Sequence, residues 1–216
     1  MKGNIIDGLY AITPDWLDDE HLLETVEAVL AGGVSLLQYR NKRADAATRL
    51  RQARALRALT RRFTVPLIIN DHLDLAEAIS AEGVHLGGND GNLAVARARL
   101  GPTAIIGASC YASIERARAA RAAGASYLAF GAVFPSLTKP NAPLAPLTLF
   151  AQAAELGLPT VAIGGIDADN IAEVGAAGAD AAAVIGSLFL ESPAPGVTAA
   201  TMLGALRAGQ ALHRGE

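Results

Sequence analysis

The chain has 216 residues, of which 51% are hydrophobic, and a formal net charge of −3 at pH 7. This length suffices for one large domain with a substantial core, and the charge gives no general reason to bind nucleic acid or an anionic membrane. The single cysteine excludes an internal disulfide and is typical of a reducing compartment. No leader-like segment is visible, and no apolar run reaches the ~18 residues of a membrane helix. We therefore expect a cytoplasmic protein without nucleic-acid or membrane partners.

Strand-like apolar runs alternate with helix-like segments rich in Ala, Leu and Arg along the whole sequence. The strand-like runs fall at residues 8–12, 34–39, 66–70, 83–86, 104–108, 127–133, 160–164 and 180–185. The helix-like segments follow them at residues 18–31, 44–62, 73–81, 92–100, 113–123, 147–156, 168–177 and 196–211. The strands are continuously apolar, as expected when both faces are covered, and repeated crossovers of this kind make them parallel.

Glycines lie between several of the predicted helices and the strands that follow them. Gly33, Gly83, Gly124 and Gly178 each lie at the first residue of a strand-like run or within three residues before it, and we expect each to take the left-handed position after a helix. About eight β-α units predict an α/β fold of the (β/α)8 TIM-barrel type, in one domain over residues 1–216. The alternative is an open doubly wound sheet. That fold would place a glycine-rich phosphate loop after the first strand, whereas residues 12–15 read Ile-Thr-Pro-Asp.

Cations follow the second strand-like run, at the end of a barrel where active sites lie. Gln38, Arg40 and Lys42 alternate along the chain, so period-two geometry puts their side chains on one side. An Arg fork and a Lys point charge can together hold several phosphate oxygens. A solvated loop is the alternative interpretation.

Carboxylates follow the third and fourth runs. Asp71, preceded by Asn70, and Asp90 come from strands that are neighbours in a barrel, and paired carboxylates suit Mg²⁺, which completes its shell with water and substrate phosphate. Asp71 could instead cap the following helix. His72 has no second His or Cys at ligand spacing, and His85 is expected to be a hydrogen-bonded core residue.

Three further clusters suit anion binding. Ser136, Thr138 and Lys139 follow the sixth run as an anion cradle, or alternatively as a turn built around prolines. Gly165 and the pair Ile185-Gly186 follow the seventh and eighth runs, where backbone N–H groups of such barrels often bind phosphate. These positions predict a pocket for phosphorylated ligands.

Four further features of the sequence lie near or outside these clusters. Ser109 ends the fifth run as a candidate phosphate donor, and the neighbouring Cys110 is interpreted as structural, because no base is evident that would activate it. The segment 135–146 is the longest irregular stretch and could act as a lid. The arginines between residues 49 and 62 are interpreted as a solvated helix face.

Taken in this order, the clusters resemble the thiamine-phosphate synthase family, from about residue 9 to residue 188. The motifs that carry the resemblance are Gln-x-Arg-x-Lys at 38–42, Asn-Asp at 70–71, His-Leu-Gly with a downstream Asp at 85–90, Thr-Lys at 138–139 and Ala-Ile-Gly-Gly-Ile at 162–166. The chain departs from many family members at Gly88, Ser136 and Gly186, and at the Cys110-Tyr111 pair.

The resemblance implies a magnesium-dependent transferase. It would couple 4-amino-2-methyl-5-hydroxymethylpyrimidine diphosphate with a thiazole phosphate, giving thiamine phosphate and pyrophosphate. By the resemblance, the pyrimidine diphosphate is held by Gln38, Arg40, Lys42, Asn70, Ser109 and Lys139, of which Lys139, Arg40 and Ser109 are catalytic. The thiazole phosphate would be held by Ser136, Thr138, Gly165, Ile185 and Gly186, and Mg²⁺ by Asp71 and Asp90.

This chemistry fits the absence of a catalytic triad in the sequence. The attacking thiazole nitrogen carries no proton, so no general base is needed, and an electron-rich aminopyrimidine favours a dissociative path through a pyrimidine cation. Two alternatives remain open: a thiazole tautomerase-like isomerase on the same barrel and a non-catalytic phosphate-binding barrel. A homo-oligomer is compatible with the sequence, which does not predict the oligomeric state.

Overall fold

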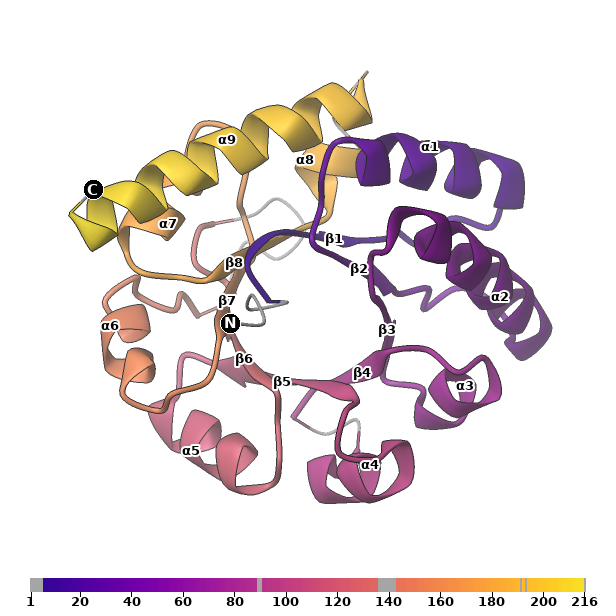
Figure 1. The fold of residues 1–216 in the computed structure, drawn as a ribbon, viewed down its shortest axis with the longest axis horizontal. Coiled ribbons are helices and arrows are strands. Elements are labelled where there is room, and N and C mark those ends of the chain that lie inside the picture. Colours follow the sequence, from indigo (N-terminus) through magenta and orange to yellow (C-terminus); the bar gives the residue numbers. More distant parts are fainter. Residues whose placement is uncertain (1–5, 89–90, 136–142, 191, 193, 216) are drawn as a thin grey trace.

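The computed structural model describes residues 6–88, 91–135, 143–190, 192 and 194–215. Its parallel strands close in chain order into a barrel ringed by helices (Figure 1), which confirms the predicted (β/α)8 fold. The strands are β1 (Gly8–Ile12), β2 (Leu36–Tyr39), β3 (Leu67–Asn70), β4 (Gly83–Leu86), β5 (Ile105–Tyr111), β6 (Tyr127–Gly131), β7 (Thr160–Ile163) and β8 (Ala181–Val184). The helices are α1 (Asp19–Ala31), α2 (Ala46–Phe63), α3 (Leu73–Ala78), α4 (Leu93–Leu100), α5 (Ile114–Ala122), α6 (Leu149–Ala154), α7 (Ile171–Ala176), α8 (Gly186–Phe189) and α9 (Pro195–Arg214).

Strand side chains divide between two apolar layers. In β1, Leu9 and Ala11 join the large cluster between strands and helices, whereas Tyr10 and Ile12 join a smaller cluster inside the barrel. This alternation follows from the period-two geometry of a strand. It explains why the strands read as continuously apolar in the sequence, since both of their faces are buried.

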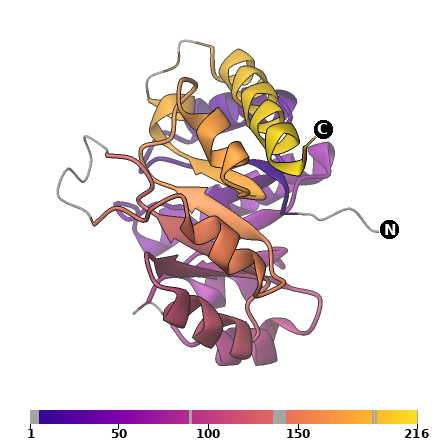
Figure 2. The same ribbon diagram turned by 90° about the vertical axis from the view of Figure 1, so that its left-hand side faces the viewer.

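The last helix lies along the outside of the barrel. Figures 1 and 2 show α9 beside α7 and α1, with which it packs. The contact with α7 is close, because a Cβ at Gly209 would lie within 3.0 Å of the backbone of α7. Among the described residues, no helix is both long and apolar enough to cross a membrane.

Local details differ from the expectation. Gly33, Gly124 and Gly178 have positive φ angles, as predicted, but Gly83 does not. Gly83 is instead the first residue of β4, where a Cβ would overlap the backbone of Ile105. The left-handed residue after α3 is Ser80, with a φ of 53°. The strand β5 also continues beyond the predicted end, and the short helix α8 was not predicted.

Candidate active site at the carboxyl ends of the strands

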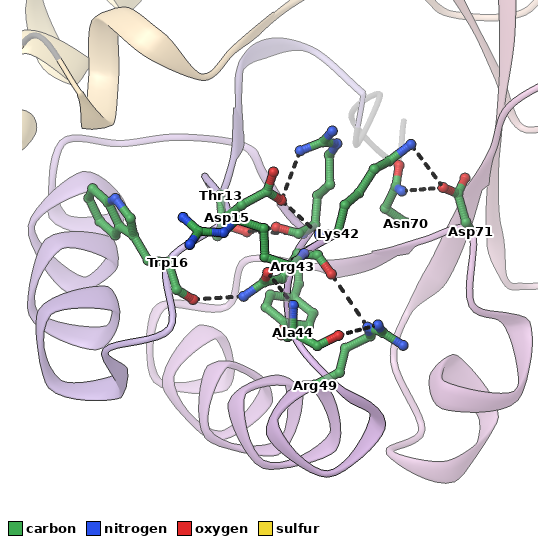
Figure 3. Close-up of polar contacts among 12 residues, drawn as sticks. Thr13, Asp15, Trp16, Lys42, Arg43, Ala44, Arg49, Asn70 and Asp71 are labelled. Carbon is green, nitrogen blue, oxygen red and sulfur yellow. Dashed lines mark hydrogen bonds and ion pairs between the residues drawn. The ribbon is translucent and has the colours of Figure 1, made fainter.

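The segment after β1 positions the two cations that follow β2 (Figure 3). The Thr13 hydroxyl donates to the Arg40 carbonyl at 3.0 Å and accepts from the Arg40 N–H at 3.0 Å. One Asp15 carboxylate oxygen lies 3.0 Å from Arg40 Nη1 and accepts from the Lys42 N–H at 2.8 Å. Sequence reasoning missed Thr13 and Asp15. Their position directly after the first strand could have indicated a role at the mouth of the barrel. In the sequence analysis, this segment was used only as evidence against a glycine-rich phosphate loop.

The alternation predicted for residues 38–42 is present. The Tyr39 hydroxyl donates to Gln52 Oε1 at 2.8 Å, and Asn41 Nδ2 donates to the same oxygen at 3.1 Å. Both side chains therefore face α2, while Arg40 and Lys42 extend toward the residues after β1 and β3. Asn41 is buried and also donates to the Trp16 carbonyl at 2.7 Å, so it ties the loops after β1 and β2 together.

A carboxylate, an amide and an ammonium group meet at the end of β3 (Figure 3). Asn70 Nδ2 donates to Asp71 Oδ2 at 2.6 Å, and Lys42 Nζ lies 3.9 Å from the same oxygen. The Asp71 backbone has a φ of 61°, and its N–H donates to the His85 carbonyl at 2.9 Å. Asp71 is not the helix cap, because His72 occupies that position without a side-chain cap bond.

The oxygen donors at this place suit a hard cation. Mg²⁺ is commonly bound by one or two carboxylates together with substrate phosphates, and Asp71 offers a carboxylate at the mouth, beside Lys42. The second predicted ligand, Asp90, lies outside the described residues. Within the described ranges, no three His, Cys, Asp or Glu side chains form a metal-binding group. Burial, with the Arg49 charge second, lowers the pKa of His72.

Gln38, His85 and Ser109 turn into the barrel. Gln38 Nε2 donates to the Tyr10 hydroxyl at 2.7 Å, and His85 Nε2 lies 2.9 Å from Ser109 Oγ. His85 is the hydrogen-bonded core residue that the sequence predicted, and burial lowers its pKa to about 4. Ser109 lies within β5 and not after it, next to a register shift between residues 109 and 111.

The thiol of Cys110, next to Ser109, lies in an environment that disfavours the reactive thiolate. Cys110 is fully buried, and burial raises its pKa to about 12. A nucleophilic cysteine needs a thiolate, so the interpretation of Cys110 as structural is consistent with the geometry.

The loops after β7 and β8 lie against each other. Ser187 Oγ donates to the Ile166 carbonyl at 2.8 Å, which links the two loops directly. Gly165 has a φ of 68°, and a Cβ there would lie 2.5 Å from the carbonyl oxygens of Phe134 and Pro135. Ile185 precedes α8, whose first residue is Gly186. The structure therefore brings Gly165, Ile185 and Gly186 to the same end of the barrel.

The remaining predicted site residues are not described. Ser136, Thr138 and Lys139 lie outside the described residues, as does most of the predicted lid at 135–146.

At Gly88, where the sequence departs from many members of the thiamine-phosphate synthase family, two side chains lie close to the backbone. A Cβ at Gly88 would lie 2.5 Å from Arg116 Nη1, and the Arg116 guanidinium lies over the Tyr111 ring at 5.2 Å. The Gly88 N–H donates to the Tyr111 hydroxyl at 3.4 Å. Arg116 and Tyr111 therefore take the space beside residue 88 that a longer side chain would need.

The basic run of α2 is accounted for by contacts within the fold. Arg51 pairs with Asp19 at 2.6 Å and Arg62 with Glu27 at 2.9 Å, both at exposed positions. Such exposed pairs contribute about 0–1 kcal/mol each, and they mark a solvated part of the helix face. The prediction is wrong for Arg57, which is only 12% exposed and pairs with Glu82, and for Arg49, which donates to the backbone carbonyls of Asn41 and Ala44.

Comparisons with known proteins agree with this geometry. The family model described as thiamine monophosphate synthase matches residues 9–188. The chain is 61% identical over 184 residues to the thiamine-phosphate synthase of Chromobacterium violaceum, covering 85% of this chain and 89% of that one. It is 60% identical over 184 residues to that of Methylobacillus flagellatus, covering 85% and 88%. The solved thiamine phosphate pyrophosphorylase from Pyrococcus furiosus matches with a TM-score of 0.84 and 34% identity, covering 95% and 98%. The chain therefore belongs to the thiamine monophosphate synthase family and is a transferase.

Proposed function

We propose that this enzyme makes thiamine phosphate by coupling 4-amino-2-methyl-5-hydroxymethylpyrimidine diphosphate with a thiazole phosphate and releasing pyrophosphate. The observation that carries the proposal is the cluster of Arg40, Lys42, Asn70 and Asp71 at the mouth of the barrel, which suits a diphosphate with its cation. The names of the close relatives support the same reaction. A cytoplasmic location and the absence of nucleic-acid partners stay predictions.

The diphosphate would lie among the groups after β2, β3 and β6. Arg40, Lys42 and Lys139 supply positive charge, and Asn70 supplies an amide donor. Asp71 and Asp90 would hold Mg²⁺, which when bound neutralises charge on the leaving diphosphate. The aminopyrimidine ring would contact Gln38 and Ser109, whose side chains face the inside of the barrel from β2 and β5.

The thiazole phosphate would lie across the mouth. Backbone N–H groups near Gly165, Ile185 and Gly186 are suited to its oxygens, because glycine lets a backbone approach closely. The hydroxyls of Ser136 and Thr138 would complete this second phosphate site.

The protein contributes to this reaction by positioning the substrates and by stabilising charge. The thiazole nitrogen attacks without losing a proton, so no side chain has to act as a base. Cations placed where negative charge develops stabilise the departing diphosphate, and they act most strongly where water is excluded. Holding both substrates in line removes the entropic cost of their encounter. These contributions favour a dissociative path, in which the aminopyrimidine delocalises a developing cation.

The test is an assay of released pyrophosphate with both substrates and Mg²⁺, with the organic product identified by mass. We expect pyrophosphate and thiamine phosphate in equal amounts, and only when both substrates are present. Isomerisation of a thiazole phosphate without pyrophosphate release would favour the tautomerase-like alternative. Tight ligand binding without any product would indicate a non-catalytic barrel.

Removal of one proposed leaving-group contact sharpens this test. Lys139→Ala should lower turnover by more than about tenfold, which corresponds to ~1.4 kcal/mol of transition-state stabilisation. A smaller effect would mean that Lys139 does not contact the departing diphosphate.

A further inference from the structure

A chain of hydrogen bonds crosses the interior of the barrel. It runs from Gln38 Nε2 to the Tyr10 hydroxyl at 2.7 Å, and from there to the Tyr127 hydroxyl at 2.9 Å. The Tyr127 hydroxyl lies 2.8 Å from His85 Nδ1, and His85 Nε2 lies 2.9 Å from Ser109 Oγ. The two ends of the chain are the residues assigned above to the aminopyrimidine ring. The three middle residues carry no role in the function proposed so far.

Gln38 Nε2, the donor at one end, determines which atom donates in every hydrogen bond of the series. An amide nitrogen only donates, so the Tyr10 oxygen accepts from Gln38 and passes its own proton to the Tyr127 oxygen. Tyr127 then donates to His85 Nδ1, which must be the unprotonated nitrogen of a neutral ring. The proton of His85 therefore lies on Nε2 and is donated to Ser109 Oγ. The reverse direction would leave the Tyr10 proton without an acceptor in a fully buried place.

The hydrogen-bond chain depends on the absence of a side chain at one position of the barrel wall, Gly107. A Cβ on Gly107 of β5 would come within 3.0 Å of the Tyr127 hydroxyl and of His85 Nδ1. Both side chains are buried, Tyr127 at 0% exposure and His85 at 8%. The tyrosine–histidine contact is therefore built into the wall of the barrel.

We propose that Tyr10, Tyr127 and His85 are positioning residues that set which hydrogen-bonding groups the enzyme offers to the pyrimidine. Tyr10 pairs in register with Leu36, two residues before Gln38, so it lies deeper in the barrel. With its nitrogen held by Tyr10, the Gln38 amide presents its oxygen as an acceptor toward the mouth. With its lone pair engaged by His85, Ser109 keeps its own proton to donate.

The consequence is selectivity for an amino group on the ring. An acceptor at Gln38 matches an exocyclic amine and opposes a carbonyl at the same ring position. Sites built around such hydrogen bonds reject the mismatched analogue strongly, because a buried polar group is then left unpaired. This inference rests on the proposed function, since it takes the aminopyrimidine as the ligand of Gln38 and Ser109.

Two measurements test the proposal. The first is the tautomer of His85 by ¹⁵N NMR of the wild-type protein at pH 7, where we expect the proton on Nε2. The second is calorimetric binding of the 4-amino pyrimidine diphosphate and of its 4-oxo analogue, without thiazole phosphate. We expect the wild-type protein to prefer the amino compound, and Tyr10→Phe or Tyr127→Phe to reduce that preference at least about tenfold.

Tyr39→Phe is the matched control. Tyr39 is also a buried tyrosine, and its hydroxyl donates to Gln52, but it faces α2 outside the barrel. Its removal should leave the amino-to-oxo preference unchanged. An equal preference in Tyr10→Phe and Tyr39→Phe, or a proton on Nδ1 of His85, overturns the proposal. Failure of the wild-type protein to bind either compound would instead contradict the proposed function, while the NMR result would still report the hydrogen-bond chain.

Discussion

Replacing Asn41 by alanine should destabilise the protein by about 3–5 kcal/mol. The Asn41 oxygen accepts the N–H groups of Arg43 and Ala44 at 3.1 and 3.0 Å, and its nitrogen donates to Trp16 and Gln52. Trp16 and Gln52 keep other partners, but the buried Ala44 N–H loses its acceptor. Two net hydrogen bonds at ~1 kcal/mol each, with one unsatisfied buried donor at ~1–3 kcal/mol, give this magnitude.

Urea unfolding followed by circular dichroism measures the loss, read from the midpoint at constant slope. Asn92→Ala is the control for stability, because Asn92 also accepts two N–H groups, at 2.8 and 3.2 Å, but as an exposed helix cap. It should lose only about 1 kcal/mol. If Asn41→Ala costs no more than Asn92→Ala, then Asn41 is not the tie between the loops after β1 and β2 that the structure indicates.

Two further predictions follow from burial. Cys110→Ala should retain activity, and a thiol reagent such as DTNB at pH 8 should not react with the native protein, because the buried thiol has a pKa of about 12; rapid reaction before unfolding would refute this. The free energy of unfolding should fall as the pH drops from about 6.5 to 4, because the unfolded chain protonates His85 there while the folded protein, with a pKa of about 4, does not. NMR signals of His85 that titrate with a midpoint near 6.5 would contradict this assignment.

The barrel was predictable because its signal is local. Alternating apolar runs and helical segments, with Gly33 and Gly124 at the joints, reflect backbone geometry that each short segment carries by itself. The exceptions are tertiary in origin. Gly83 is small because the neighbouring strand approaches it, not because a helix ends there. Ser80 takes the left-handed conformation that the pattern assigned to a glycine.

The mouth of the barrel was predictable only in part. Gln38, Arg40, Lys42, Asn70 and Asp71 stand out because polar side chains end apolar strands. Thr13 and Asp15 also follow an apolar strand, but their role could not be predicted from that place, since it depends on contacts with Arg40, more than twenty residues away.

Of the interior hydrogen-bond chain, the sequence predicted only that His85 is a hydrogen-bonded core residue. Tyr10 and Tyr127 are 117 residues apart and read as ordinary core aromatics. Gly107 reads as an ordinary strand glycine, and its purpose depends on the tyrosine and histidine that meet beside it. Only the closed barrel brings these residues together.

We propose that a cation at Asp71 and the surrounding positive groups stabilise the departing diphosphate. The most direct measurement is the rate of pyrophosphate release as Mg²⁺ is added back to metal-stripped protein, compared between wild type and Asp71→Asn. We expect no release without Mg²⁺, saturable release in the wild type, and a requirement for at least about tenfold more Mg²⁺ in Asp71→Asn, equivalent to ~1.4 kcal/mol. Release that persists after metal removal, or the same Mg²⁺ dependence in both proteins, would contradict the account.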